Sequence, residues 1–68
     1  MSEIIFHINS IKDLDKISEF VSNEGTTNVQ INIKDKSNDL SFKLKNKRHI
    51  DRKTINILRN NDIYAIIN

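Results

Sequence analysis

Most side chains that could bind a charged ligand lie in one basic stretch, residues 43–53. Six of these residues are Lys or Arg and one is Asp, so the stretch has a formal charge of +5, whereas the rest of the chain carries −3. A local excess of one sign attracts anions, either nucleic-acid phosphates or acidic side chains of another protein. The predicted partner-binding residues are Lys43, Lys45, Lys47, Arg48, His49, Arg52 and Lys53.

Genome composition offers a second explanation for these lysines. Ile, Asn and Lys make up 31 of the 68 residues, and all three have AT-rich codons, so a biased genome would place extra lysine on any surface. Arg52 and Lys53, however, fall in the first turn of a predicted helix, where the helix dipole disfavours cations. Two explanations stay open for this violation: the free N–H groups at that terminus bind an anion or an acidic partner, or the long side chains are simply solvated and Asp51 compensates the dipole.

The remaining reactive side chains form no catalytic or metal-binding pattern. The chain has two histidines and no cysteine, which excludes a disulfide framework and a zinc finger. His7 and His49 each lack a carboxylate or nucleophile at a fixed spacing. The sequence therefore predicts a protein that is not an enzyme, with no metal, no cofactor and no small-molecule substrate.

Hydrophobic periodicity predicts the elements that position these residues. Alternating apolar residues predict strands at Ile4–Ile8, Val29–Ile33, Leu40–Leu44 and Ile63–Ile67, and helical spacing predicts helices at residues 11–24 and 51–61. The order β-α-β-β-α-β predicts an α+β fold, the ferredoxin-like split βαβ sandwich. Its four-stranded sheet has the order 4-1-3-2 and carries both helices on one face.

Local signals predict where the helices and the hairpin begin and end. Ser10 is expected to cap the first helix, and Gly25, the only glycine, is expected to end it in the left-handed conformation. Asp51 is the predicted N-cap of the second helix. Residues 34–39 contain no Gly, which favours a hairpin loop longer than two residues.

The same alternation predicts which strand side chains lie beneath the helices. These are Ile4, Phe6, Ile8, Val29, Ile31, Ile33, Leu40, Phe42 and Leu44. On the open face, His7 is expected between Ser41 or Lys43 on one side and Tyr64 or Ile66 on the other. With both phenylalanines in the core, the base-stacking platform of an RNA-recognition motif is missing. The edge strand Val29–Ile33 is expected to accept a partner strand.

Length and hydropathy predict one domain, residues 1–68, with one small core. No apolar run approaches the roughly 20 residues of a membrane span. Residues 1–5 do not resemble the start of a signal peptide. The expectation is a soluble, cytoplasmic protein that does not contact membranes.

The complete pattern resembles the small C-terminal domain that follows the OB-fold in the α subunit of bacterial DNA polymerase III. The resemblance spans almost the whole chain and rests on hydrophobic positions. It is carried by Ile5-Phe6-His7-Ile8, Gly25, Val29-Gln30-Ile31-Asn32-Ile33, Leu40-Ser41-Phe42-Lys43-Leu44, Lys47-Arg48-His49-Ile50-Asp51, Leu58 and the closing strand. It implies a docking role in DNA replication, with the τ subunit of the clamp loader as partner and no catalytic activity.

The leading hypothesis is therefore a non-enzymatic protein-interaction domain that binds through residues 43–53. One alternative is a small nucleic-acid-binding module, which would use the same residues with modest affinity and strong salt dependence. The other is a small regulator or inhibitor of a larger protein. Both alternatives stay open on the sequence.

Overall fold

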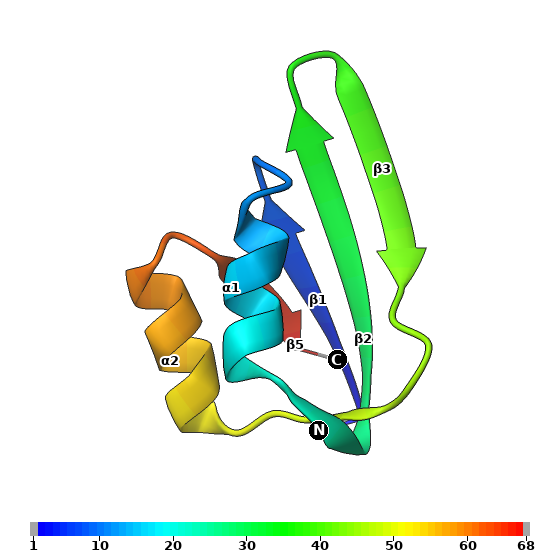
Figure 1. Cartoon of the computed structure of the whole chain (residues 1–68), viewed down its shortest axis with the longest axis vertical. Helices are drawn as coiled ribbons and strands as arrows, with labels where there is room; N and C mark the ends of the chain where they lie inside the picture. The colour runs from blue at the N-terminus through cyan, green and yellow to red at the C-terminus, as the bar shows by residue number, and fades with distance from the viewer. Residues whose placement is uncertain (1, 68) are drawn as a thin grey trace.

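Two helices and five strands make up the computed structural model, which describes residues 2–67 apart from the side chain of Asn23 (Figure 1). The protein is a small α+β domain with a mixed sheet. Its elements are β1 (Glu3–Ile8), α1 (Asp13–Phe20), β2 (Ser22–Asp35), β3 (Asn38–Lys43), β4 (Arg48–His49), α2 (Arg52–Asn60) and β5 (Tyr64–Ile67).

The order of the strands differs from the ferredoxin-like prediction, which is wrong. The order is β3-β2-β1-β5, with β4 paired to β2 outside this path. β1 and β2 are parallel, and the other pairs are antiparallel. The prediction placed the second strand of the hairpin beside β1, but β2 lies there instead. The segment Val29–Ile33 is therefore central and is not an edge that could accept a partner strand.

The side chains of the hairpin explain this order. β2 contributes three β-branched side chains to one face, Val29, Ile31 and Ile33, and all three are buried. β3 is short, and each of its residues is exposed. Placing β2 in the centre buries the β-branched residues, and charged side chains such as Asp39 and Lys43 suit an edge strand.

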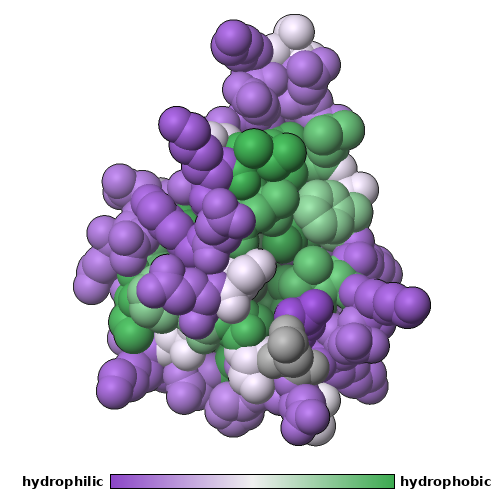
Figure 2. All heavy atoms as spheres, in the orientation of Figure 1, coloured by the Kyte–Doolittle hydropathy of each residue, from purple (hydrophilic) through white to green (hydrophobic). Residues whose placement is uncertain are grey.

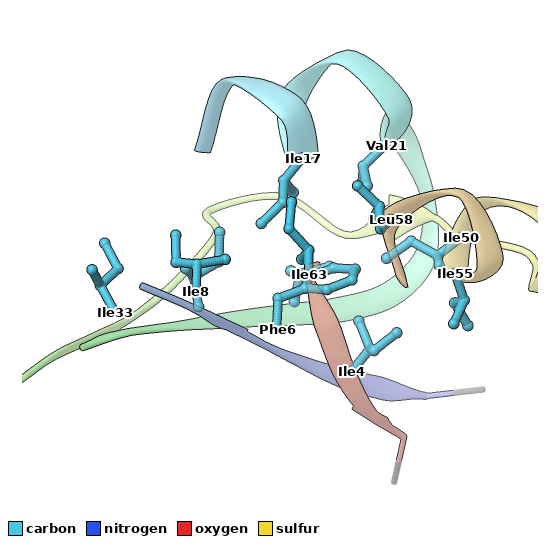
Figure 3. Packing of buried hydrophobic residues seen from close by; sticks show 12 residues of the cluster. Ile4, Phe6, Ile8, Ile17, Val21, Ile33, Ile50, Ile55, Leu58 and Ile63 are labelled. Carbon is cyan, nitrogen blue, oxygen red and sulfur yellow. The ribbon is translucent and has the colours of Figure 1, made fainter. Parts of the chain in front are cut away.

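Both helices lie on one side of the sheet, as predicted. Figure 3 shows Ile17 of α1, Val21 just after this helix and Leu58 of α2 directed toward the sheet, and Phe6 directed from the sheet toward them. The described core consists of Ile4, Phe6, Ile8, Ile17, Val21, Val29, Ile31, Ile33, Ile50, Ile55, Leu58 and Ile63. Removing these side chains from water is the main source of stability.

The prediction of a fully covered helix-side face is wrong for β3. Leu40 is 56% exposed and Phe42 is 39% exposed, while Leu44 is half-buried. Ile33 pairs with Leu40 and Ile31 with Phe42, so these side chains do lie on the helix side. They are partly uncovered because β3 is at the edge of the sheet and α1 does not lie over it. Ile11, the first residue of the helix predicted over residues 11–24, lies before α1 and is 63% exposed.

Helix α1 is shorter than predicted at both ends. It begins at Asp13, and Ser10 is not its N-cap: the Ser10 hydroxyl accepts a hydrogen bond from the Lys12 amide in the preceding turn. The helix ends at Phe20 and is followed by Val21 in extended conformation. Gly25 therefore does not end the helix, and it has no positive φ.

Gly25 is needed instead because two backbone segments meet there. It lies in the first half of β2, which bends between its two pairs with β4, Ser22 with His49 and Thr27 with Arg48. A Cβ atom at position 25 would overlap with the backbone carbonyl of Arg48 and the amide nitrogen of His49. The missing side chain thus lets β4 approach β2.

Helix α2 matches the prediction at both ends. Asp51 is its N-cap, and Ile55 and Leu58 are its buried residues. At the C-terminal end Asp62 has a φ of 63°. The Asp62 amide donates to the Arg59 carbonyl, and the Ile63 amide donates to the Leu58 carbonyl. This pattern is a Schellman motif with Asp62 in place of the usual glycine.

The β2–β3 hairpin has a tight turn, and the predicted longer loop is wrong. Asp35 pairs with Asn38, so only Lys36 and Ser37 form the turn. Lys36 has a φ of 55°, which an L-residue other than glycine adopts at a cost of about 1 kcal/mol. The pairing along both strands outweighs this cost, and the absence of glycine did not prevent a two-residue turn.

Candidate protein-binding groove

The predicted basic residues follow the lower edge of the molecule and do not gather in one cluster. Figure 1 shows the chain leaving β3, passing the lower end of the sheet in this view and entering α2. Lys43 ends β3, while Lys45 and Lys47 are exposed in the connection. Arg48 and His49 form β4, and Arg52 and Lys53 are exposed in the first turn of α2. The structure therefore arranges these residues as a basic rim.

Arg48 is the one member of the rim that is half-buried. Its Nε donates a hydrogen bond to the carbonyl oxygen of Asn46, at 3.1 Å. Its backbone pairs with Thr27 of β2. These contacts fix the connection against the sheet, so the guanidinium is held beside the apolar residues described below.

Asp51 organises the start of α2. Its Oδ1 accepts hydrogen bonds from the Thr54 amide, at 2.8 Å, and from the Thr54 hydroxyl, at 2.9 Å. The hydrogen bond from the Thr54 amide is the main reason that the pKa of Asp51 lies below its ordinary value of 3.8. Nε2 of His49 is 4.0 Å from Oδ2 of the same carboxylate. The Asp51 carboxylate already supplies a negative charge at this helix terminus, which reduces the need for a bound anion there. Anion binding at Arg52 and Lys53 stays a prediction.

The lowered pKa predicts a pH-dependent contribution of Asp51 to stability. A carboxylate with a depressed pKa in the folded state stabilises above its unfolded pKa, and the effect disappears as pH falls through the folded value. We expect Asp51→Ala to melt at a lower temperature than wild type at about pH 7, and the difference in melting temperature to be smaller at about pH 3. Thermal unfolding followed by circular dichroism measures this difference at each pH.

Asp51→Asn is the matched control, because asparagine also caps helices but carries no charge. It should lose less stability than the alanine variant at neutral pH. A gap between wild type and Asp51→Ala that stays constant across this pH range would contradict the assignment.

An apolar groove runs between α1 and β3 on the helix side of the sheet. It has a volume of about 200 Å³, and six of its eight lining residues are apolar; the lining consists of Leu14, Ile17, Ser18, Val21, Ile31, Phe42, Leu44 and Arg48. Ile17, Val21 and Ile31 form its buried floor, and Leu14, Phe42 and Leu44 are partly accessible at its walls. Arg48 is the charged residue of the lining.

The groove belongs to a larger apolar surface. Figure 2, seen from the helix side, shows a continuous hydrophobic area beside α1 with purple, hydrophilic residues around it. Leu40 and Phe42, the two exposed apolar residues of β3, contribute to this side of the sheet. Contiguous apolar surface with a polar rim is typical of interaction sites.

The opposite, open face carries a row of polar residues. Tyr64, His7, Asn32 and Ser41 lie side by side on β5, β1, β2 and β3. His7 is thus between Tyr64 and Asn32, not beside Ser41 or Lys43 as predicted, because β2 and not β3 is its neighbour.

The polar side chains of β2 and β3 on this face bond to one another. Nε2 of Gln30 donates to Oδ1 of Asn32 and to Oγ of Ser41, both at 2.9 Å, and the Ser41 hydroxyl donates to Asn32 Oδ1 at 2.7 Å. An amide oxygen is not a general base, so this arrangement does not activate the serine as a nucleophile.

A larger hollow, of about 410 Å³, lies near the end of β1, beside the β2–β3 hairpin. It is lined by His7, Ile8, Asn9, Asn32, Ile33, Lys34, Asp39, Leu40 and Ser41. Asn32 and Ser41 are already bonded to each other, and the lining carries no excess of one charge. The smaller groove is the better candidate because it combines accessible apolar walls with the basic rim.

No group of three or more His, Asp or Glu side chains within residues 2–67 could hold a metal ion. Neither described helix is long and apolar enough to cross a membrane. Comparison with protein-family models, curated proteins and solved structures gave no match.

The groove was missed from the sequence, although its basic rim was predicted. Phe42 and Leu44 were expected to lie in a covered core, and the alternation does place both on the helix side. The groove depends on β3 being the edge strand, which hydrophobic periodicity does not reveal. The charged residues of β3, Asp39 and Lys43, were the available signal in the sequence, and all six residues of this strand are exposed.

Proposed function

We propose that the chain is a cytoplasmic, non-enzymatic protein-interaction domain that binds an acidic partner segment with apolar anchor residues. The observation that carries the proposal is the groove between α1 and β3, with Phe42 and Leu44 accessible on one wall and Arg48 in its lining. Apolar anchors supply most of the affinity in such sites, and charged residues around them steer the partner and fix its orientation.

The charge of the rim indicates the chemistry of the partner. Lys43, Lys45, Lys47 and Arg48 follow one another along the chain next to the groove. A partner whose apolar residues are flanked by Asp or Glu would satisfy both surfaces. The resemblance to the polymerase III domain proposes a clamp-loader subunit as this partner, and a larger protein regulated by this chain would fit the same chemistry.

Selection from a displayed peptide library tests this proposal. Enriched peptides should contain apolar residues flanked by Asp or Glu. Lys47→Glu together with Arg48→Glu should weaken binding of a selected peptide by about tenfold or more, because the rim then repels its acidic residues. Phe42→Asp should do the same by placing a charge in the wall of the groove. Isothermal titration calorimetry measures both losses.

Matched controls exist elsewhere on the surface. Lys34→Glu with Lys36→Glu reverses two charges at the far end of the hairpin, and Tyr64→Asp changes an exposed aromatic residue on the open face. Both should leave peptide binding unchanged. Equal losses in the control variants, or salt-sensitive submicromolar binding to a single-stranded DNA oligonucleotide without peptide binding, would overturn the proposal and favour the nucleic-acid module.

A further inference from the structure

The outer edge of β3 is an unused pairing surface among the described residues. β3 pairs with β2 on one side, and within residues 2–67 no strand pairs with its other side. An exposed edge presents free backbone donors and acceptors to any strand that can approach it.

The backbone groups that face outward can be assigned from the hairpin register. The Leu44 amide donates to the Val29 carbonyl, at 2.8 Å, and Gln30 lies opposite Lys43. In an antiparallel pair, alternate residues direct both their N–H and C=O groups to the partner strand. Counting back from Leu44, Phe42 and Leu40 therefore bond to β2. Asp39, Ser41 and Lys43 direct their backbone groups to the free edge.

The sequence of β3 is complementary to itself in one antiparallel register. When Ser41 lies opposite Ser41 of a second copy, Asp39 lies opposite Lys43 and Leu40 lies opposite Phe42, twice each. The Asp39–Lys43 pairs fall on the open face with Ser41, and the Leu40–Phe42 pairs fall on the helix side. A register in which Leu40 lies opposite Leu40 of the second copy is less favourable. It sets Asn38 opposite Phe42 and separates Asp39 from Lys43.

We propose that β3 pairs with β3 of a second copy of this chain, antiparallel and centred on Ser41, to form a two-fold symmetric dimer with a continuous sheet. Each of the three residues with outward backbone groups then meets another such residue, so the ladder is satisfied without rearrangement. Leu40 and Phe42, 56% and 39% exposed, cover each other across the interface. Cross-strand apolar and opposite-charge pairs are the units that stabilise such sheets.

The groove lies on the inner side of β3 and the proposed interface on its outer side. The two sites share the side chains of Phe42 and Lys43, but pairing of the strand edges does not require the partner proposed above, so either proposal can fail without the other.

Charge reversal with complementation tests the register directly. Lys43→Asp sets two acids against each other across the interface. Asp39→Lys sets two lysines against each other and is made together with Lys34→Glu, because Lys34 faces Asp39 within the hairpin. We expect sedimentation equilibrium to show wild-type dimers, each variant alone to associate about tenfold or more weakly, and an equimolar mixture of the two variants to regain the dimer.

Hydrogen exchange supplies a second readout that does not depend on variants. The Ser41 amide should exchange quickly at low protein concentration and become protected as the concentration rises, whereas the Phe42 amide should be protected throughout. A wild-type protein that stays monomeric up to about millimolar concentration overturns the proposal. A dimer that survives both charge reversals, or that leaves the Ser41 amide unprotected, also overturns it because another surface must then form the interface.

Discussion

Gly25→Ala is expected to lower the free energy of unfolding by about 3 kcal/mol or more, although it adds one methyl group. The added Cβ would overlap with backbone atoms of Arg48 and His49, which cannot rotate away as a side-chain tip could. β4 and the bend of β2 would have to separate. A domain of this size has a total stability of roughly 3–10 kcal/mol, so urea unfolding should show a largely unfolded or strongly destabilised variant.

Two further variants distinguish this steric role from the helix-ending role that the sequence predicted. Asparagine tolerates the left-handed conformation of a helix C-terminus, so Gly25→Asn would be the milder change if Gly25 served there. A close approach of two backbones makes Asn at least as damaging as Ala. Thr26→Ala, at an exposed neighbour in the same strand, is the matched control and should cost little. A Gly25→Ala variant as stable as this control would contradict the steric role.

Much of the fold could be predicted because the spacing of apolar residues along the chain indicates the type of secondary structure and the face of the sheet on which each side chain lies. The four long strands, both helices and the buried positions Ile4, Phe6, Ile8, Val29 and Ile31 follow from alternation alone. The N-cap at Asp51 follows from its side-chain chemistry. These features depend on residues close together in the chain.

The order of the strands could not be predicted in the same way. Exchanging β2 and β3 leaves every side chain on its original face, so the period of two is identical for both arrangements. The two residues of β4 are too few to show a period. The predictions for Gly25 and for the hairpin turn were wrong because the conformation at each place depends on a second backbone segment, β4 for Gly25 and the paired strands β2 and β3 for the turn. The groove could not be predicted for the same reason, since it exists only when β3 is the edge strand.

Phenylalanine truncation on a central strand and on the edge strand tests the strand order itself. Phe6 and Phe42 both lie on the helix side, but Phe6 is fully buried on central β1 and Phe42 is 39% exposed on edge β3. We expect Phe6→Ala to lower the free energy of unfolding by about 3–5 kcal/mol, because it removes a whole ring from the core and leaves a cavity. Phe42→Ala should cost only about 1–2 kcal/mol, since part of its ring already contacts water.

Chemical denaturation at low protein concentration measures both values without a contribution from pairing between copies of β3. Leu58→Ala and Leu40→Ala form a second matched pair, with Leu58 fully buried and Leu40 56% exposed. In the ferredoxin-like order β3 would be a central strand beneath the helices, and both members of each pair would then lose similar free energy. A large loss at Phe6 and Leu58 with a small loss at Phe42 and Leu40 is expected only if β3 lies at the edge. That position is also what exposes the groove wall and the strand edge to partners.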